Sequence, residues 1–92
     1  MKRLAIIPAF NEAGAIVATI EDIKKNAPSF DYVVINDHSN DATEELLKEH
    51  GYNYVSLPIN SGIGAAVQTG YMYAYRHGYD CAIQVDGDGQ HD

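Results

Sequence analysis

The sequence predicts one α/β domain with three layers, helices packed on both faces of a mostly parallel, Rossmann-like sheet of about four strands. Three observations lead to this fold class. The chain has only 92 residues, short β-rich runs alternate with segments of helical periodicity, and a polar or glycine-rich turn follows each β-rich run. Such alternation favours parallel strands with right-handed crossovers. No linker or repeat divides the chain, so we expect a single domain over residues 1–92.

The first expected strand is the apolar run at residues 4–7, which stops at Pro8. A continuous apolar run suits a strand that is buried on both faces. A helix is expected from residue 13 to about residue 25, because isoleucines and valines recur at helical spacing and charged residues lie between them. Asn26 and Pro28 favour its end. A second strand is expected at residues 32–35.

The second half of the chain repeats this order. Residues 41–48 predict a helix with acids in its first turn and a stop at Gly51, and residues 52–57 predict a third strand. A third helix is expected over residues 62–77, with Ile63, Ala66, Val67, Gly70 and Ala74 on one face. Small residues at four-residue steps on that face would let the helix approach the sheet closely. Residues 81–85 predict a fourth strand.

Charge and cysteine content exclude several classes of protein. Thirteen acidic residues against six Lys and Arg give a net charge of −7, which opposes a nucleic-acid partner. Cys81 is the only cysteine, so no internal disulfide can form and a reducing, cytoplasmic location fits. No apolar run is long enough to span a membrane. An acidic chain that binds a nucleotide diphosphate would need a divalent cation between carboxylates and phosphates.

Two polar segments follow the first two strands, at the edge where open α/β sheets bind ligands. Residues 8–12 could bring backbone against a base or ribose, or could be an ordinary strand-to-helix turn with Glu12 near the helix start. In residues 36–41, Asp37 is expected to contact a ligand, whereas Asn40 and Asp41 are expected to cap the next helix.

The segment before the third helix contains Gly62 and Gly64, whose backbone amides could approach a phosphate or ribose. A simple helix-start turn remains the alternative. The segment lacks the third glycine of a dinucleotide-binding loop and the Lys-Ser/Thr of a P-loop, which disfavours both classes.

Asp86 and Asp88 are the most specific indication of a binding site in the sequence. Two carboxylates separated by one glycine, just after a strand, repel each other unless a cation or protons intervene. Mg²⁺ and Mn²⁺ take such oxygen ligands, often together with substrate phosphates. A calcium-binding loop is disfavoured, because it would need further ligands at fixed spacing. A solvated acidic turn without a ligand remains the structural alternative. The four histidines lack zinc-site spacing, and only His91 lies beside these acids.

Taken in order, residues 8–12, 36–43, 60–66 and 86–92 resemble the motifs of family 2 glycosyltransferases, most closely the dolichyl-phosphate-mannose-synthase-like branch. The resemblance implies the A-type glycosyltransferase fold, a UDP- or GDP-linked sugar donor and a divalent metal, Mg²⁺ or Mn²⁺. The implied nucleotide contacts are Pro8, Ala9, Glu12, Asp37, Gly62, Gly64 and Asp86. The implied metal ligands, in a DXD motif, are Asp86, Asp88 and Gln90. One departure is Asn36 before Asp37, where the family usually has two acids.

The resemblance implies transfer of the sugar, with inversion, to an acceptor such as a polyprenyl phosphate or a saccharide. The acceptor-binding half and the catalytic base are expected beyond Asp92, so this chain alone is expected to be inactive and a longer form to act at the inner membrane surface. The alternative is a non-catalytic, truncated nucleotide-binding or regulatory module. A receiver-type domain is disfavoured, because residues 57–59 hold no phosphoacceptor acid. An exposed sheet edge is expected to favour a homo-oligomer.

Overall fold

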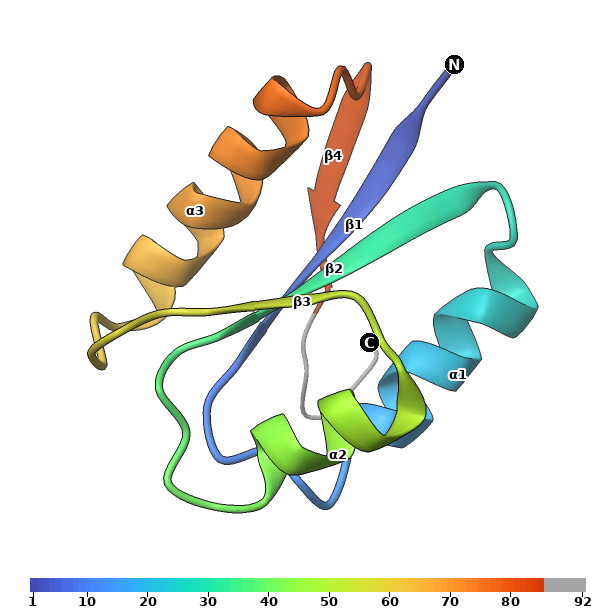
Figure 1. Cartoon of the computed structure of the whole chain (residues 1–92). Helices are drawn as coiled ribbons and strands as arrows, with labels where there is room; N and C mark the ends of the chain where they lie inside the picture. Colours follow the sequence, from blue (N-terminus) through green and yellow to red (C-terminus); the bar gives the residue numbers. More distant parts are fainter. Residues whose placement is uncertain (86–92) are drawn as a thin grey trace.

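The computed structural model describes residues 1–85 and contains strictly alternating strands and helices. The elements are β1 (Arg3–Ala9), α1 (Ile16–Asn26), β2 (Phe30–Asn36), α2 (Thr43–His50), β3 (Tyr54–Ser56), α3 (Ile63–Arg76) and β4 (Cys81–Gln84). The strands lie in the order β3-β2-β1-β4, and each neighbouring pair is parallel. Helix α3 covers one face of the sheet, and α1 and α2 cover the other (Figure 1). The predicted three-layer α/β/α fold is confirmed.

Strand β1 forms the centre of the core because it is buried on both faces. Ala5 and Ile7 pack with residues of α1 and α2, among them Ile16 and Leu47. Leu4 and Ile6 point the other way and pack with the side of α3 that carries Ala66 and Ala74. Side chains alternate between the faces along a strand, so an unbroken apolar run fills two separate clusters.

Helix α3 approaches the sheet closely at Gly70, as its small residues predicted. A Cβ atom at this position would lie 2.3 Å from Cγ2 of Ile6, which is closer than carbon atoms can approach. The prediction was wrong for Ile63, which is 65% exposed. Buried contact between α3 and the sheet begins only one turn later, at Ala66.

Strand β1 continues through Pro8 and Ala9, beyond the predicted end at residue 7. Pro8 lies in register with Ile35 of β2. On the other side, Val85 N donates to Ile6 O at 2.8 Å, and the next bond of a parallel ladder would need an N–H at residue 8. Proline has none, so Pro8 cannot make the next bond toward Val85, although β1 continues through it.

The other boundaries differ by a few residues. Helix α1 begins at Ile16 and not at residue 13, because residues 13–15 form a turn in which Ala15 N and Ile16 N donate to Glu12 O at 3.0 and 2.8 Å. Helix α2 begins at Thr43, two residues after the predicted start, and ends at His50; the predicted stop at Gly51 is confirmed, and its left-handed φ of 70° suits glycine. Strand β3 is shorter than predicted, with three residues.

The strand order reverses beside β1. The chain leaves β1 to form β2 and β3 on one side, and returns through α3 to form β4 on the other. In open α/β sheets, ligands bind outside the carboxyl ends of the strands at such a switch point. This arrangement directs attention to the loops that follow β1, β2 and β3.

Candidate functional site

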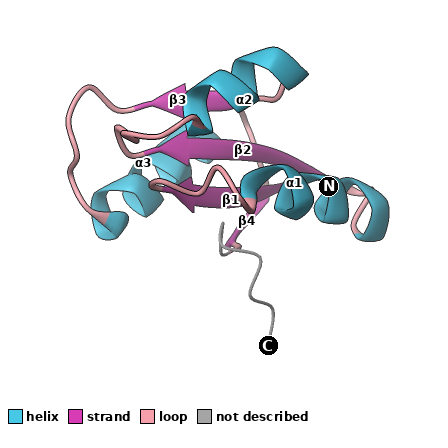
Figure 2. Ribbon diagram, turned by 90° about the horizontal axis from the view of Figure 1, so that it is seen from below, coloured by secondary structure: helices cyan, strands magenta, loops and turns pink. Residues whose placement is uncertain are grey.

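Three loops leave the carboxyl ends of the strands. Loop A is residues 10–15 after β1, loop B is residues 37–42 after β2, and loop C is residues 57–62 between β3 and α3. Figure 2 shows the arrowheads of β1, β2 and β3 pointing the same way, with the loops at that end. Side chains at this edge bond mainly to backbone N–H groups of a neighbouring loop, which ties the three loops together.

Asp37 joins loop B to β1 and to the start of α3. Its N–H donates to Ala9 O at 2.8 Å, and the residue is 3% exposed. Its two carboxylate oxygens accept hydrogen bonds from Ser61 N and Gly62 N, each at 2.8 Å. Asn60 Nδ2 also donates to Asp37 O at 3.3 Å. One buried side chain therefore fixes the N–H groups that lead into α3, which a helix cannot satisfy internally.

The contact of Asp37 with a nucleoside stays a prediction. Each carboxylate oxygen has two acceptor sites, and the hydrogen bonds described use one on each. Acceptor capacity therefore remains for a ligand donor. The structure nevertheless gives Asp37 a second task that the sequence did not reveal, which is to hold loop C.

The two glycines of the predicted phosphate-binding segment, Gly62 and Gly64, differ in backbone conformation. Gly62 has φ 89° and ψ 162°, a conformation that other residues rarely adopt. Gly64 has no positive φ, and a Cβ atom there would meet nothing within 4 Å. Both lie exposed at the start of α3. The backbone requires glycine only at residue 62, and the role of either in binding phosphate stays a prediction.

Loop A is joined to loop B and to the first residue of α2 by four short polar side chains, which we call the loop clamp: Asn11, Ser39, Asp41 and Thr43. Asn11 N donates to Ser39 Oγ at 3.0 Å, and Asn11 Oδ1 accepts from Asn40 N at 2.7 Å and from Asp41 N at 3.3 Å. Glu12 N donates to Thr43 Oγ1 at 3.0 Å. The backbone of loop A is thus held at several consecutive residues.

Asp41 serves both loops. Its Oδ2 accepts from Ala13 N at 3.2 Å, and its Oδ1 accepts from Thr43 N at 2.9 Å and from the Thr43 hydroxyl. Burial alone would raise the pKa of Asp41, but the hydrogen bonds from Thr43 and Ala13 hold that pKa below its usual value. The predicted caps were wrong in position, because the N-cap residue of α2 is Ala42, which makes no side-chain cap hydrogen bond; Asp41 accepts from Thr43 N from one residue before the cap. The backbone N–H of Asn40 is bonded to Asn11, which the sequence reading did not anticipate.

The predicted metal ligands Asp86, Asp88 and Gln90 lie outside the described residues, as does His91. Within residues 1–85, no group of three or more histidine, cysteine, aspartate or glutamate side chains is arranged to hold a metal ion. Val85 lies beside the carboxyl half of β1 through its bond to Ile6 O. The residue just before the DXD motif is therefore placed next to the switch point.

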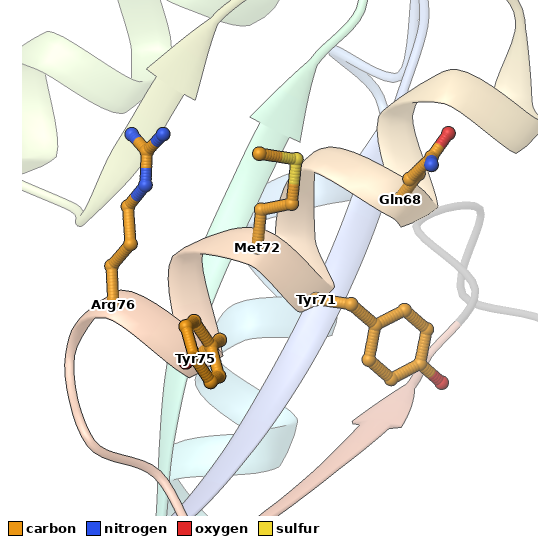
Figure 3. A pocket seen from close by; sticks show the side chains of 5 residues that line it. All are labelled: Gln68, Tyr71, Met72, Tyr75 and Arg76. Carbon is orange, nitrogen blue, oxygen red and sulfur yellow. The ribbon is translucent and has the colours of Figure 1, made fainter.

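A separate hollow lies on the outer face of α3, away from the three loops. Its volume is about 410 Å³, and it is lined by Gln68, Tyr71, Met72, Tyr75 and Arg76 (Figure 3). Tyr71 and Met72 are about half exposed, and Tyr75 is almost fully exposed. The residues that we expected to bind a ligand lie at the carboxyl edge of the sheet, so this hollow is not part of the candidate site.

In the described part of the chain, no helix is long and apolar enough to cross a bilayer.

Comparisons with known proteins agree with this geometry. A model of glycosyl transferase family 2 matches residues 4–92. The undecaprenyl-phosphate mannosyltransferase of Micrococcus luteus is 28% identical over 96 residues, which cover 99% of this chain and 40% of that protein. The UDP-N-acetylglucosamine–dolichyl-phosphate N-acetylglucosaminyltransferase of Methanococcus voltae is 32% identical over 104 residues, which cover 94% of this chain and 41% of that protein.

Solved structures show the same fold. A mannosyltransferase from Pyrobaculum calidifontis in complex with GDP-Man and Mn²⁺ matches with a TM-score of 0.78 at 21% identity, over 95% of this chain and 27% of that one. Glucosyl-3-phosphoglycerate synthase from Mycobacterium tuberculosis in complex with UDP matches with a TM-score of 0.77 at 23% identity, over 98% of this chain and 35% of that one. The chain spans less than half the length of these relatives. Because the family model matches nearly all of its residues, the chain belongs to glycosyltransferase family 2.

Proposed function

We propose that this chain binds a nucleotide-sugar donor, linked to UDP or GDP, together with Mg²⁺ or Mn²⁺ at the carboxyl edge of its sheet. One observation carries the proposal: Asp37 is buried at the switch point and ties the end of β1 to the start of α3. Two of the similar structures are complexes with GDP-Man and Mn²⁺ and with UDP, which supports this ligand class.

The proposed contacts divide between the nucleoside and the diphosphate. Pro8 and Ala9 end β1, Glu12 lies in loop A and Asp37 in loop B, and these four residues would face the nucleoside. Gly64 offers a backbone N–H group at a helix start, while Gly62, whose N–H donates to Asp37, would let the backbone come close to the diphosphate. The proposed metal ligands are Asp86, Asp88 and Gln90, with Asp86 also close to the nucleotide. A divalent cation would offset the repulsion between phosphates and a chain of charge −7, and would stabilise the leaving diphosphate.

In a longer protein, we propose that the donor sugar passes with inversion to a polyprenyl phosphate or a saccharide. Relatives named for undecaprenyl phosphate and dolichyl phosphate support the first acceptor class. The reaction also needs a positioned acceptor and a base, and positioning alone can be worth roughly 7–11 kcal/mol. We place both beyond Asp92, so this chain alone should transfer no sugar.

Calorimetry tests the binding step directly. UDP and GDP are titrated into the chain with Mn²⁺, with Mg²⁺ and with chelator, and we expect weak binding that chelator abolishes. Asp88→Asn should remove the metal-dependent part, because it removes a charged oxygen ligand. Asp80→Asn makes the same charge change at the opposite edge, where the Asp80 side chain accepts from Lys2 N and its N–H donates to Lys2 O, and should bind like the unmodified chain. Binding that persists in chelator would contradict the metal bridge.

A transfer assay tests the division of labour between the two halves. The 92-residue chain and a version extended with the acceptor half of a relative are given labelled UDP- and GDP-sugars, Mn²⁺, polyprenyl phosphates and saccharides. We expect turnover from the extended protein alone. Metal-dependent turnover by the short chain, lost in His91→Ala, would place the base within these residues.

Self-association through the sheet edge is also proposed. Strand β4 is an edge strand of the described sheet, and its Ile83 is 42% exposed on the side of the sheet that α1 and α2 cover elsewhere. Unpaired edges with apolar side chains invite pairing with another chain. Sedimentation over a concentration series should show association that Ile83→Lys weakens, whereas a strictly monomeric chain would contradict the proposal.

A further inference from the structure

We propose that Asn11 is a positioning residue, which holds loop A against loop B so that the residues on both loops face a nucleotide together. The inference rests on the proposed function for its binding readout. Asn11 is not one of the proposed nucleotide contacts, but it directly precedes one of them, Glu12.

The bonds of Asn11 cross from one loop to the other. Its N–H donates to Ser39 Oγ at 3.0 Å, and its side-chain oxygen accepts from Asn40 N at 2.7 Å and Asp41 N at 3.3 Å. These partners are 28 to 30 residues away in the sequence, so the contacts do not belong to a local turn. One side chain therefore fixes two consecutive N–H groups of loop B.

The backbone of Asn11 explains why this position suits asparagine. Its φ is 53°, in the left-handed region where asparagine, aspartate and glycine are tolerated best. His38 on loop B has φ 54°, so each loop turns sharply at one residue. Glycine would accept the conformation of residue 11 and offer no acceptor, alanine would meet neither need, and aspartate would meet both.

The clamp completes a chain of contacts across the site. Asp37 already ties loop B to loop C through Ser61 N and Gly62 N. Asn11 ties loop A to loop B, so three segments from distant parts of the sequence form one bonded unit. Binding a ligand to loops that are already ordered avoids the entropy cost of ordering them, and a loss of the clamp should therefore weaken binding.

Three variants at this position separate the hydrogen bonds from the backbone conformation. Asn11→Gly keeps the conformation and loses the acceptor, Asn11→Asp keeps both, and Asn11→Ala loses both. Asn53→Ala is the matched control, because Asn53 also makes two side-chain bonds, to Tyr32 O at 3.0 Å and the Tyr73 hydroxyl at 3.1 Å, at the opposite edge. A residue that only adds stability should behave like this control.

The experiment measures affinity for UDP and GDP with Mn²⁺, thermal midpoint and amide hydrogen exchange in each variant. We expect Asn11→Gly and Asn11→Ala to bind about tenfold more weakly and to exchange the Asn40 and Asp41 amides faster. Asn11→Asp should restore both measurements. Asn53→Ala should lower the thermal midpoint and leave affinity unchanged.

Two outcomes overturn the inference: unchanged exchange at Asn40 and Asp41 in Asn11→Gly, or equal losses of affinity in Asn11→Gly and Asn53→Ala at equal stability. If the unmodified chain binds neither nucleotide, the proposed function fails separately. The exchange data then decide whether Asn11 holds the two loops together.

Discussion

The two edges of the sheet are held together by different kinds of contact. At the carboxyl edge, short side chains bond to backbone N–H groups, as Asn11 and Asp37 do. At the amino edge, Asp80 also accepts from a backbone N–H, that of Lys2, but long side chains add further links: the Tyr79 hydroxyl donates to Asp31 Oδ2 at 2.7 Å, and Lys2 Nζ donates to His77 O at 2.8 Å. Ordering a long side chain costs more rotamer entropy than ordering a short one, so short side chains hold backbone groups in place at a smaller entropic cost.

This difference suggests a division between positioning and stability. A ligand site built from loops needs the loop backbone in place before the ligand arrives. The amino edge carries no residue that we expect to bind a ligand, and there contacts need only keep the elements packed. Changes at the carboxyl edge should therefore alter binding and stability together, and changes at the amino edge should alter stability alone.

The largest effect is expected where α3 touches the sheet between the two edges. Gly70→Val would drive side-chain atoms into Ile6, and we expect it to lower the free energy of unfolding by about 2–4 kcal/mol. Gly64→Ala is the control within the same helix, because its Cβ meets nothing within 4 Å, and it should raise stability by about 0.5–1 kcal/mol. Urea unfolding measures both. Equal effects would show that α3 does not lie as close to β1 as described.

The next effect is expected from Asp37→Ala at the carboxyl edge. Removing two bonds to a charged group should cost about 1.5–3 kcal/mol of unfolding free energy, since water can reach the N–H groups of the exposed Ser61 and Gly62. Nucleotide binding should fall below detection, because loop C loses its tie to loop B. Urea unfolding and calorimetry together test this. A stable variant that binds normally would remove Asp37 from the site.

A smaller effect is expected from Tyr79→Phe at the amino edge. The variant loses one hydroxyl bond to Asp31, which should cost about 1 kcal/mol of unfolding free energy. Affinity for the nucleotide and metal should stay that of the unmodified chain in the same calorimetric assay. A change in affinity would mean that the two edges are coupled through β1 and β4, against the division proposed above.

The smallest expected effect is on the pH dependence of the unfolding free energy, which should differ between the two edges. Burial and the hydrogen bond to Asp31 raise the pKa of Tyr79 to about 12, so its contribution to stability is full below about pH 10 and is lost as the pH rises through 12. The lowered pKa of Asp41 has the opposite sign, so its contribution is present above about pH 4 and is lost as the pH falls further. Urea unfolding at several pH values should show Tyr79→Phe flattening the alkaline loss and Asp41→Asn flattening the acidic loss.

Much of this fold could be predicted from the sequence, because periodicity reports which residues are buried. The small side chains at Ala66, Gly70 and Ala74 predicted the close approach of α3 correctly. Ile63 was placed wrongly because helical periodicity cannot tell where a helix leaves the sheet that it covers. Strand ends were missed for a similar reason: Pro8 withholds a bond from one neighbour and does not end the strand, and this depends on which neighbour lies on each side.

The candidate site was predicted in part. Each named segment within the described residues lies at a strand end, as the alternating pattern required, but the bonds between loops could not be read from spacing. Asn11 and Thr43 lie about thirty residues from their partners, and only the parallel order of β1 and β2 brings them together. The local sequence offered one indication of the loop clamp: Asn11 is a polar residue of a type that tolerates the left-handed backbone conformation.

Pro8 withholds a backbone donor at the switch point, which no change in the neighbouring side chains can restore. Here a missing hydrogen atom on the backbone of β1 prevents the next bond toward Val85. Any other residue at position 8 would supply that donor, and its N–H could form one more hydrogen bond toward Val85. The covalent structure of a single residue therefore limits the hydrogen bonding between β1 and Val85.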